Sequence, residues 1–180
     1  RFKEVAAHAD IEDENQTVAY PDIRTEAKDA LTRTHYGAGS STKLTDTVTY
    51  SNLEPGKEYT MKGILMDKAT GKAVLHDGRE ITAEKKFKPE KTDGTVEIVF
   101  EFPEGLFAGK MVVAFETCYR EDKEVAVHAD IEDENQTVAY PDIRTEAKDA
   151  LTRSHYGSCS STRITDVVTY SSLEPGKDYT

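Results

Sequence analysis

Tryptophan is absent from this chain of 180 residues, and long apolar runs are absent as well. No stretch approaches the roughly 18 consecutive apolar residues of a membrane-spanning helix, so we expect no membrane insertion in this segment. The sequence begins with charged residues in a strand-like pattern and shows no signal peptide. We therefore expect any secretion or anchoring signal to lie outside these 180 residues.

Cysteine and positive charge are also scarce. Two cysteines cannot build a disulfide framework, and no CxxC motif or neighbouring Cys/His pair predicts a metal site. Acidic residues outnumber basic ones by 34 to 23, which gives a net charge of −11. Nucleic acid and anionic membranes are therefore poor partners, and the sequence indicates neither a metal nor a cofactor.

The first and last sixty residues are nearly the same sequence. Residues 1–60 and 121–180 agree at 49 of 60 positions, which gives a period of 120 residues. Such a period is too long for a solenoid and has the size of one whole β-sandwich domain. The chain therefore contains one and a half tandem repeats.

Proline marks the expected boundaries between repeats. Tyr20-Pro21-Asp22 recurs as Tyr140-Pro141-Asp142, and proline cannot donate to a β-ladder and restricts the residue before it. We predict that residues 1–20 are the C-terminal strand region of a preceding repeat. Residues 21–140 then form a complete domain, and residues 141–180 begin a following repeat.

Alternating apolar and polar residues predict short strands throughout the complete unit. The alternation is strictest at Val96, Ile98, Phe100 and Phe102. The predicted strands are residues 45–50, 59–66, 81–87, 95–102, 111–119, 125–128 and 136–140. No segment has a convincing helical period, so we predict an all-β fold of Ig-like β-sandwich domains in tandem.

Five polar residues of the complete unit stand in or beside these strands: Thr25, Asp46, Glu116, His128 and Gln136. Pattern alone favours an outward-facing Glu116, because carboxylates at strand positions are normally solvated, and a surface position for His128 at the end of its strand. Thr25 and Gln136, taken singly, are ordinary polar strand residues. Nothing in the pattern pairs the threonine with the glutamine.

Several motifs that occur in a fixed order carry a resemblance. They are residues 53–60 (LEPGKEYT), Val113-Ala114-Phe115-Glu116, His128-Ala129-Asp130-Ile131 and Gln136-Thr137-Val138. Together they resemble the VaFE repeat of Gram-positive surface-anchored proteins, which is also described as the T-Q ester-bond domain. The resemblance extends over the complete unit and both flanking segments.

This resemblance implies an Ig-like domain with a self-formed ester cross-link between a threonine on the first strand and a glutamine on the last. Carried over residue by residue, it assigns Thr25 and Gln136 to the cross-link. It assigns His128, Glu116 and Asp46 to catalysis of the cross-linking reaction.

The implied chemistry suits these residue types. A threonine hydroxyl is a weak nucleophile, and histidine is the usual base that activates it. Two close acids such as Asp46 and Glu116 would share one proton, which could polarise the glutamine carbonyl. Ammonia would leave once per domain, so we predict autocatalytic maturation and not an enzyme that turns over a substrate.

The flanking segments carry incomplete versions of the same residues. His8 and Gln16 match His128 and Gln136 of a preceding domain, and Thr145 and Asp166 match the first half of a following domain. Each segment lacks the other half, so we expect neither to close its own ester within this chain.

Two further features leave alternatives open. Cys118 shares the strand face of Glu116, and Cys159 stands where the earlier copy has Gly39. The two could form a disulfide between successive domains or be unrelated thiols.

The acidic residues 10–15 suggest a calcium loop, but they lack its glycine and its final glutamate. A solvated acidic loop is the favoured interpretation.

Near-identical repeats with a cross-linking constellation favour a structural stalk or fibre repeat of an extracellular, cell-wall-anchored or cell-surface bacterial protein. Its partners would be neighbouring repeats of the same chain, with any host ligand bound by a distal domain. The alternative is a ligand-binding adhesin domain without a formed cross-link. A hydrolase using His128 with Thr25 is disfavoured, because the glutamine would consume the threonine.

Overall fold

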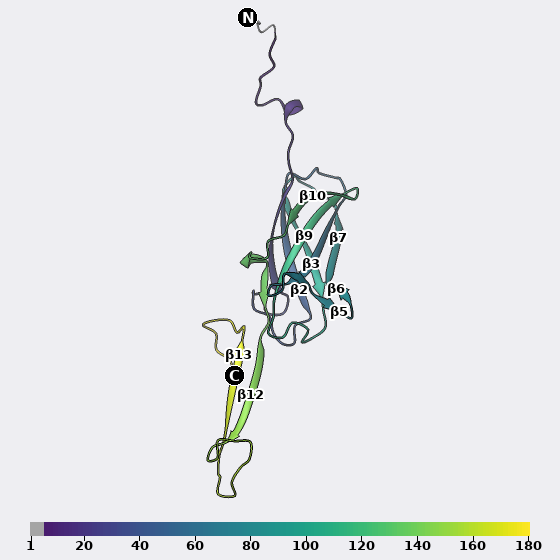
Figure 1. Ribbon diagram of the computed structural model, residues 1–180. Coiled ribbons are helices and arrows are strands. Elements are labelled where there is room, and N and C mark those ends of the chain that lie inside the picture. Colours follow the sequence, from purple (N-terminus) through teal and green to yellow (C-terminus); the bar gives the residue numbers. More distant parts are fainter. Residues whose placement is uncertain (1–5) are drawn as a thin grey trace, which may run out of the picture.

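The computed structural model describes residues 6–180 (Figure 1). One closed β-sandwich occupies the middle of the chain, residues 6–20 extend from one end of it, and a two-stranded ribbon follows at the other end. The prediction of an all-β, Ig-like sandwich is confirmed. No helix in the described part of the chain is long and apolar enough to span a membrane.

Two antiparallel sheets form the sandwich. The smaller sheet has the order β1 (Asp22–Asp29), β2 (Lys43–Ser51), β8 (Gly94–Glu101). The larger sheet has the order β10 (Lys123–His128), β9 (Met111–Arg120), β3 (Tyr59–Asp67), β4 (Lys72–Ala73). Two further strands belong to it: β7 (Thr82–Phe87) pairs with β3, and β11 (Thr137–Ala139) pairs with β9.

Smaller elements complete the chain. Strands β5 (Leu75–His76) and β6 (Arg79–Glu80) pair to form a short hairpin with a two-residue loop at residues 77–78. Two 3₁₀ turns, η1 (Glu14–Gln16) and η2 (Glu134–Gln136), occupy equivalent positions of the repeat. The strand predicted at residues 136–140 therefore begins one residue later, because Gln136 ends the second turn.

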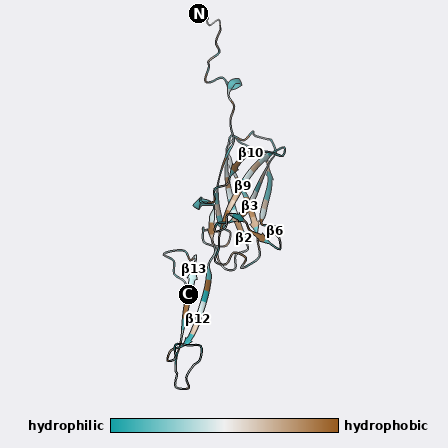
Figure 2. Cartoon of the chain, viewed as in Figure 1, coloured by the Kyte–Doolittle hydropathy of each residue, from teal (hydrophilic) through white to brown (hydrophobic). Residues whose placement is uncertain are grey.

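Alternating burial explains why these segments form a sandwich. Along β8, every second residue from Val96 to Phe100 is buried and its neighbours are exposed. Figure 2 shows hydrophobic and hydrophilic residues interleaved along the strands in the same way. The largest fully buried apolar side chains are Phe100, Phe107, Ile23, Leu44, Leu53, Met61, Leu65 and Ile98.

Gly63 on β3 allows the two sheets to approach closely next to Glu116. It pairs with Glu116 in the register of β3 and β9. A Cβ atom at this position would lie 2.5 Å from Cζ of Phe100 on the opposite sheet. The absent side chain therefore leaves room for the Phe100 ring to pack directly against the backbone of β3.

Tyr140 closes the far end of the sandwich. It is 3% exposed, whereas the equivalent Tyr20 is 78% exposed. Its backbone N–H donates to the Lys110 carbonyl at 2.9 Å, and its hydroxyl donates to Asp29 at 3.3 Å. Burial, reinforced by Asp29, raises the pKa of this phenol. The last residue of the sandwich is thus fixed before the chain leaves it.

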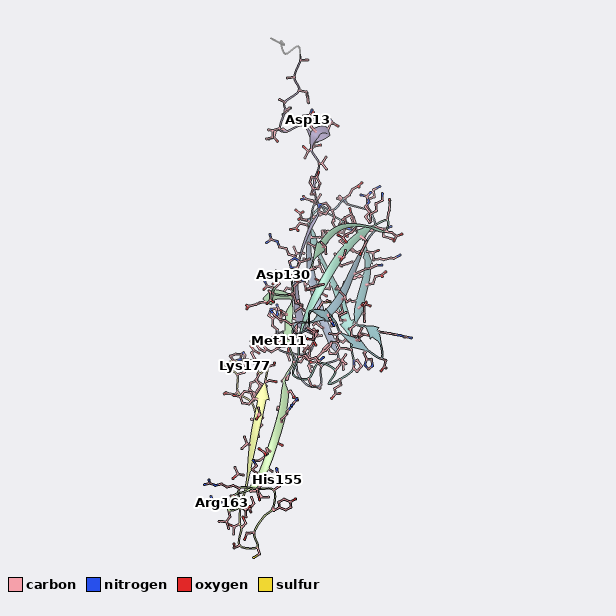
Figure 3. All side chains as sticks on the ribbon, viewed as in Figure 1. Asp13, Met111, Asp130, His155, Arg163 and Lys177 are labelled. Carbon is pink, nitrogen blue, oxygen red and sulfur yellow. The ribbon has the colours of Figure 1, made fainter. Side chains whose placement is uncertain are left out.

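The ribbon repeats the local structure of the first hairpin without its cover. Strands β12 (Asp142–Asp149) and β13 (Ile164–Ser171) pair in the register of β1 and β2. Ile143 is nevertheless 60% exposed, while the equivalent Ile23 is 1% exposed. Figure 3 shows the side chains of this ribbon standing free on both faces. Sequence thus determines the hairpin, but the remaining strands are needed to bury it.

Candidate functional site: a buried threonine–glutamine contact

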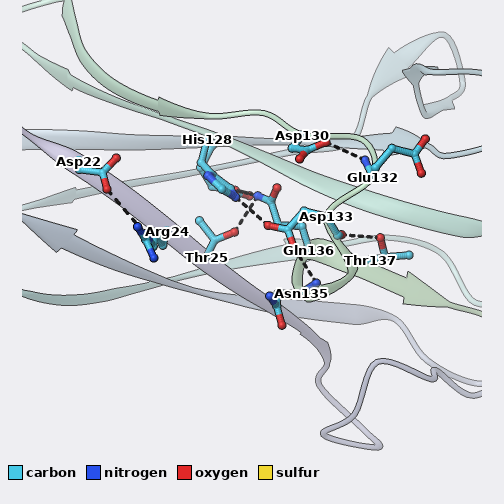
Figure 4. A network of polar contacts seen from close by, with 11 residues as sticks. Asp22, Arg24, Thr25, His128, Asp130, Glu132, Asp133, Asn135, Gln136 and Thr137 are labelled. Carbon is cyan, nitrogen blue, oxygen red and sulfur yellow. Dashed lines mark hydrogen bonds and ion pairs between the residues drawn. The ribbon is translucent and has the colours of Figure 1, made fainter.

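The structure brings Thr25 and Gln136 into direct contact although 111 positions separate them. The Gln136 amide nitrogen donates a hydrogen bond of 2.7 Å to the Thr25 hydroxyl (Figure 4). Thr25 is 7% exposed and Gln136 is fully buried. A nucleophilic hydroxyl and a carboxamide therefore meet in the interior, away from bulk water.

The 3₁₀ turn η2 explains the inward direction of Gln136. The Asp133 carboxylate caps this turn by accepting a hydrogen bond of 2.8 Å from the Asn135 N–H. The Asp133 carbonyl accepts from the Gln136 N–H at 3.2 Å and from the Thr137 hydroxyl at 2.8 Å. The tight turn leaves Asn135 exposed and directs the next side chain into the core.

Glu116 lies on the other side of the same amide. Its Oε2 accepts a hydrogen bond of 2.7 Å from the Gln136 amide nitrogen, and the residue is fully buried in β9. The outward orientation favoured by the sequence pattern is therefore wrong for Glu116. It occupies an inward position of its strand together with Ala114 and Cys118, which are also buried.

Asp46 is the second buried carboxyl of the site. It pairs with Ala27 in the register of β1 and β2, two positions along β1 from Thr25, and it is fully buried. Neither of its carboxyl oxygens has a hydrogen-bond donor among the described residues, and the same is true of Glu116 Oε1 and Gln136 Oε1. A proton held between the two acids would supply one of the missing donors.

Burial raises the pKa of both acids. The pKa of Glu116 is raised well above its usual value by burial and then by the neighbouring Asp46. The pKa of Asp46 is also raised by burial, although contacts with Glu116 and the charge of His128 oppose that rise. Two adjacent buried carboxyls cannot both ionise cheaply, so this pair retains a proton.

His128 ends β10 at the mouth of the site, opposite Glu116 in the strand register. Its Nε2 lies 2.9 Å from the Asp133 carboxylate. A shallow pocket of about 440 Å³ is lined by Thr25, His128, Asp133 and neighbouring residues. Figure 4 shows His128 next to Thr25 and Gln136. The imidazole of His128 and Thr25 thus line the same solvent-accessible pocket.

Asp133 was not singled out by the sequence analysis. Partial burial would raise its pKa, but hydrogen bonds with His128 and the Asn135 N–H lower it overall. The ionised carboxylate therefore orients the imidazole through the 2.9 Å contact. The sequence feature that could have indicated this role is the His-x4-Asp spacing, which occurs in both copies of the repeat. Since the two copies are identical at nearly every position, the shared spacing did not distinguish Asp133 from its neighbours.

The flanking equivalents are not assembled into a site. His8 contacts Asp13 as His128 contacts Asp133, but Gln16 is exposed. Thr145 and Asp166 are exposed on the ribbon. The local contacts of the motif thus form alone, whereas the contact between threonine and glutamine requires the whole sandwich.

The disulfide considered between Cys118 and Cys159 is not formed. Both are free thiols. Cys118 is buried in the core, where desolvation raises its pKa to about 11, and Cys159 is exposed in the ribbon. Among the described residues, no group of three or more His, Cys, Asp or Glu side chains could hold a metal ion.

A comparison with protein families identifies the chain. The model of the "T-Q ester bond containing domain" matches residues 1–20, 21–140 and 141–180. The chain belongs to this family. It is a family of ester-bond domains and is not known as an enzyme family. No curated protein sequence matches the chain.

Solved structures support the fold. Two crystal forms of a bacterial adhesin from Mobiluncus mulieris match the chain, an adhesin described as containing intramolecular disulfide, isopeptide and ester bond cross-links. One gives a TM-score of 0.53 at 13% identity over 85% of this chain and 75% of the adhesin chain. The other gives 0.51 at 13% identity over 84% and 74%.

Proposed function

We propose that residues 21–140 form a cross-linked structural repeat of a bacterial cell-surface protein, in which the chain itself joins Thr25 to Gln136 through an ester. The observation that carries this proposal is the buried 2.7 Å contact between the Thr25 hydroxyl and the Gln136 amide. Membership of the T-Q ester-bond family supports the same chemistry. The fold shared with a cross-linked adhesin supports a surface location.

His128 is the proposed base. As the Thr25 hydroxyl oxygen attacks the side-chain carbonyl carbon of Gln136, its proton passes to the imidazole, which Asp133 orients through the 2.9 Å contact. Asp133 is thus a positioning residue. The pocket beside Thr25 and His128 provides a path for proton exchange and for departing ammonia.

The carboxyl pair is the proposed acid. Glu116 contacts the amide nitrogen at 2.7 Å, so a proton held by the pair can assist departure of that nitrogen. This differs from the expectation that the acid polarises the carbonyl oxygen. The bond between Thr25 Oγ1 and the carbonyl carbon forms, the carbon–nitrogen bond breaks, and the nitrogen leaves as ammonia with the proton given by the carboxyl pair. The imidazolium then returns the threonine proton to the pair through solvent, so the protons balance.

The proposed role is mechanical. The ester would join the first strand to the turn before the last strand, so tension on the termini would pass through a covalent bond and bypass the strand ladders. Neighbouring repeats of the same chain are the proposed partners, with residues 20–21 and 140–141 as the boundaries. Any host ligand would bind a distal domain.

Intact mass after denaturation tests this proposal on the full chain. We expect the parent to be lighter than its sequence by one molecule of ammonia, and Thr25→Ala and Gln136→Ala to have their full sequence mass. The matched controls Thr145→Ala and Gln16→Ala change the same residue types in the incomplete flanks, and they should keep the mass loss. A parent with its full sequence mass would refute the cross-link and leave ligand binding as the next candidate.

A further inference from the structure

The last strand of the sandwich is held from two sides. Along one edge, β11 pairs with β9. Along the other it meets the loop that follows β1, residues 30–37, which we call the receptor loop. The Ala139 N–H donates to the His35 carbonyl at 2.8 Å, and the Gly37 N–H donates to the Ala139 carbonyl at 2.8 Å. The loop after the threonine-bearing strand therefore binds the strand that follows the glutamine.

His35 adds a side-chain contact to this backbone pairing. Its Nδ1 lies 3.1 Å from the Thr137 carbonyl oxygen. Because a carbonyl oxygen can only accept a hydrogen bond, Nδ1 carries the donated proton. Thr137 is the residue directly after Gln136 (Figure 4). The imidazole therefore fixes the backbone one residue away from the reacting amide.

The receptor loop is shaped by hydrogen bonds of its own. The Thr32 hydroxyl donates to the Tyr36 carbonyl at 2.7 Å, and the Thr34 hydroxyl accepts from the Tyr36 N–H at 3.0 Å. The equivalent bonds are present in the ribbon, at 2.7 and 3.1 Å. Since the ribbon has no last strand beside it, the loop adopts this shape without one. It is thus preformed to receive β11.

His155, the equivalent histidine of the ribbon, shows which contact depends on the whole sandwich. Its Nε2 lies 3.6 Å from Glu146 Oε1, much as the Nε2 of His35 lies 3.9 Å from Glu26 Oε1. This contact is local to the hairpin, and Glu26 is paired more closely with Lys28, at 2.8 Å. The bond from Nδ1 to the carbonyl of the last strand is therefore the contact that the complete domain adds.

We propose that His35 is a positioning residue for ester formation. It touches neither reacting group, and it acts through Thr137 by holding the last strand where the Gln136 carbonyl carbon is within reach of the Thr25 hydroxyl. This inference rests on the proposed cross-linking reaction. Attack on a carbonyl requires close and well-oriented approach, so a small shift of the amide slows it strongly.

Three substitutions at His35 separate its two ring nitrogens. The rate of ammonia loss during refolding of the full chain is followed by intact mass. His35→Ala should slow it at least about fivefold. His35→Asn places an amide N–H where Nδ1 stands, so it should react within about twofold of the parent rate. His35→Gln extends its amide to the position of Nε2 and should be as slow as His35→Ala.

His155→Ala is the matched control, because it removes the same residue type from the same loop in the incomplete repeat. It should react at the parent rate. Circular dichroism checks that every variant is folded. A parent rate in His35→Ala would overturn the proposal, and so would a rate in His35→Asn as low as that of His35→Ala. Equal slowing by His155→Ala would reduce the effect to the loop alone and also reject it.

Amide hydrogen exchange tests the contact independently of the ester. In the Thr25→Val background, which cannot form the cross-link, adding His35→Ala should speed exchange of the Ala139 N–H at least about fivefold. Adding His155→Ala should leave it unchanged. The mass of the parent thus tests the cross-link, whereas this exchange tests whether His35 holds β11. Unchanged exchange in the His35→Ala variant would reject His35 as a positioning residue even if the parent cross-links.

Discussion

Replacement of Thr25 by valine should remove most of the stability that the cross-link confers. The ester would close a loop spanning 111 positions, and by analogy with a disulfide such closure contributes about 5 kcal/mol. Valine also leaves one N–H of the buried Gln136 amide without an acceptor, while Glu116 still accepts from the amide nitrogen, which costs about 1–3 kcal/mol. We therefore expect Thr25→Val to lower the free energy of unfolding by about 6–8 kcal/mol in sum.

Guanidinium unfolding followed by circular dichroism measures this difference, with intact mass recorded for each sample. Thr25→Ser is the matched control, because serine keeps the hydroxyl and loses only a methyl group. It should still cross-link and remain within about 1.5 kcal/mol of the parent. The cross-linked proteins should also show a smaller m-value, because their unfolded chains expose less surface.

One result would refute the reasoning about loop closure. If the parent has lost ammonia and Thr25→Val has not, but their unfolding free energies differ by less than about 3 kcal/mol, the difference is no larger than the lost hydrogen bond alone. The ester would then transmit force without contributing to equilibrium stability.

Three further predictions concern the carboxyl pair and the packing. Glu116→Gln removes the shared proton and should slow ammonia loss at least about 100-fold in a refolding time course followed by mass. In the uncross-linked Thr25→Val background, the raised pKa of Glu116 means that the folded state holds this proton more tightly than the unfolded state. The melting temperature should therefore fall as the pH rises above about 4.3. This dependence on pH should be weaker when Glu116→Gln is added. Gly37→Ala would place a Cβ 2.2 Å from the Tyr140 ring, whereas at Gly157 the nearest atom lies at 3.5 Å; calorimetry should find a loss of about 1–3 kcal/mol for the first and little for the second.

The strands could be predicted from sequence because alternation reports directly on a half-buried sheet. Residues 95–102 illustrate this, since the inward residues Val96, Ile98 and Phe100 are the buried ones. The same reasoning could not predict the orientation of Glu116. A charged side chain is normally expected to face solvent, whereas the position of Glu116 in β9 directs it into the core. Its contacts with Asp46 and with the Gln136 amide are what stabilise a buried carboxyl there.

The turn that presents Gln136 could not be predicted for a different reason. A 3₁₀ turn of three residues is too short to produce a helical period, so the sequence pattern extended the last strand through Gln136. The role of Asp133 was hidden for the same reason, since it depends on how the turn brings the carboxylate back to His128. The family resemblance named the reacting pair, but the loop geometry required the structure.

The separation between successive sites determines how much a fibre of such repeats can lengthen. Thr145 lies nine residues after Gln136 in the sequence, and nine residues span at most about 32 Å when fully extended. The 111 positions enclosed by each ester would otherwise release roughly 380 Å of chain per repeat on unfolding. If the proposed ester closes in every repeat, this length of chain is not released. A fibre of such repeats would then keep a fixed length under tension until a covalent bond breaks.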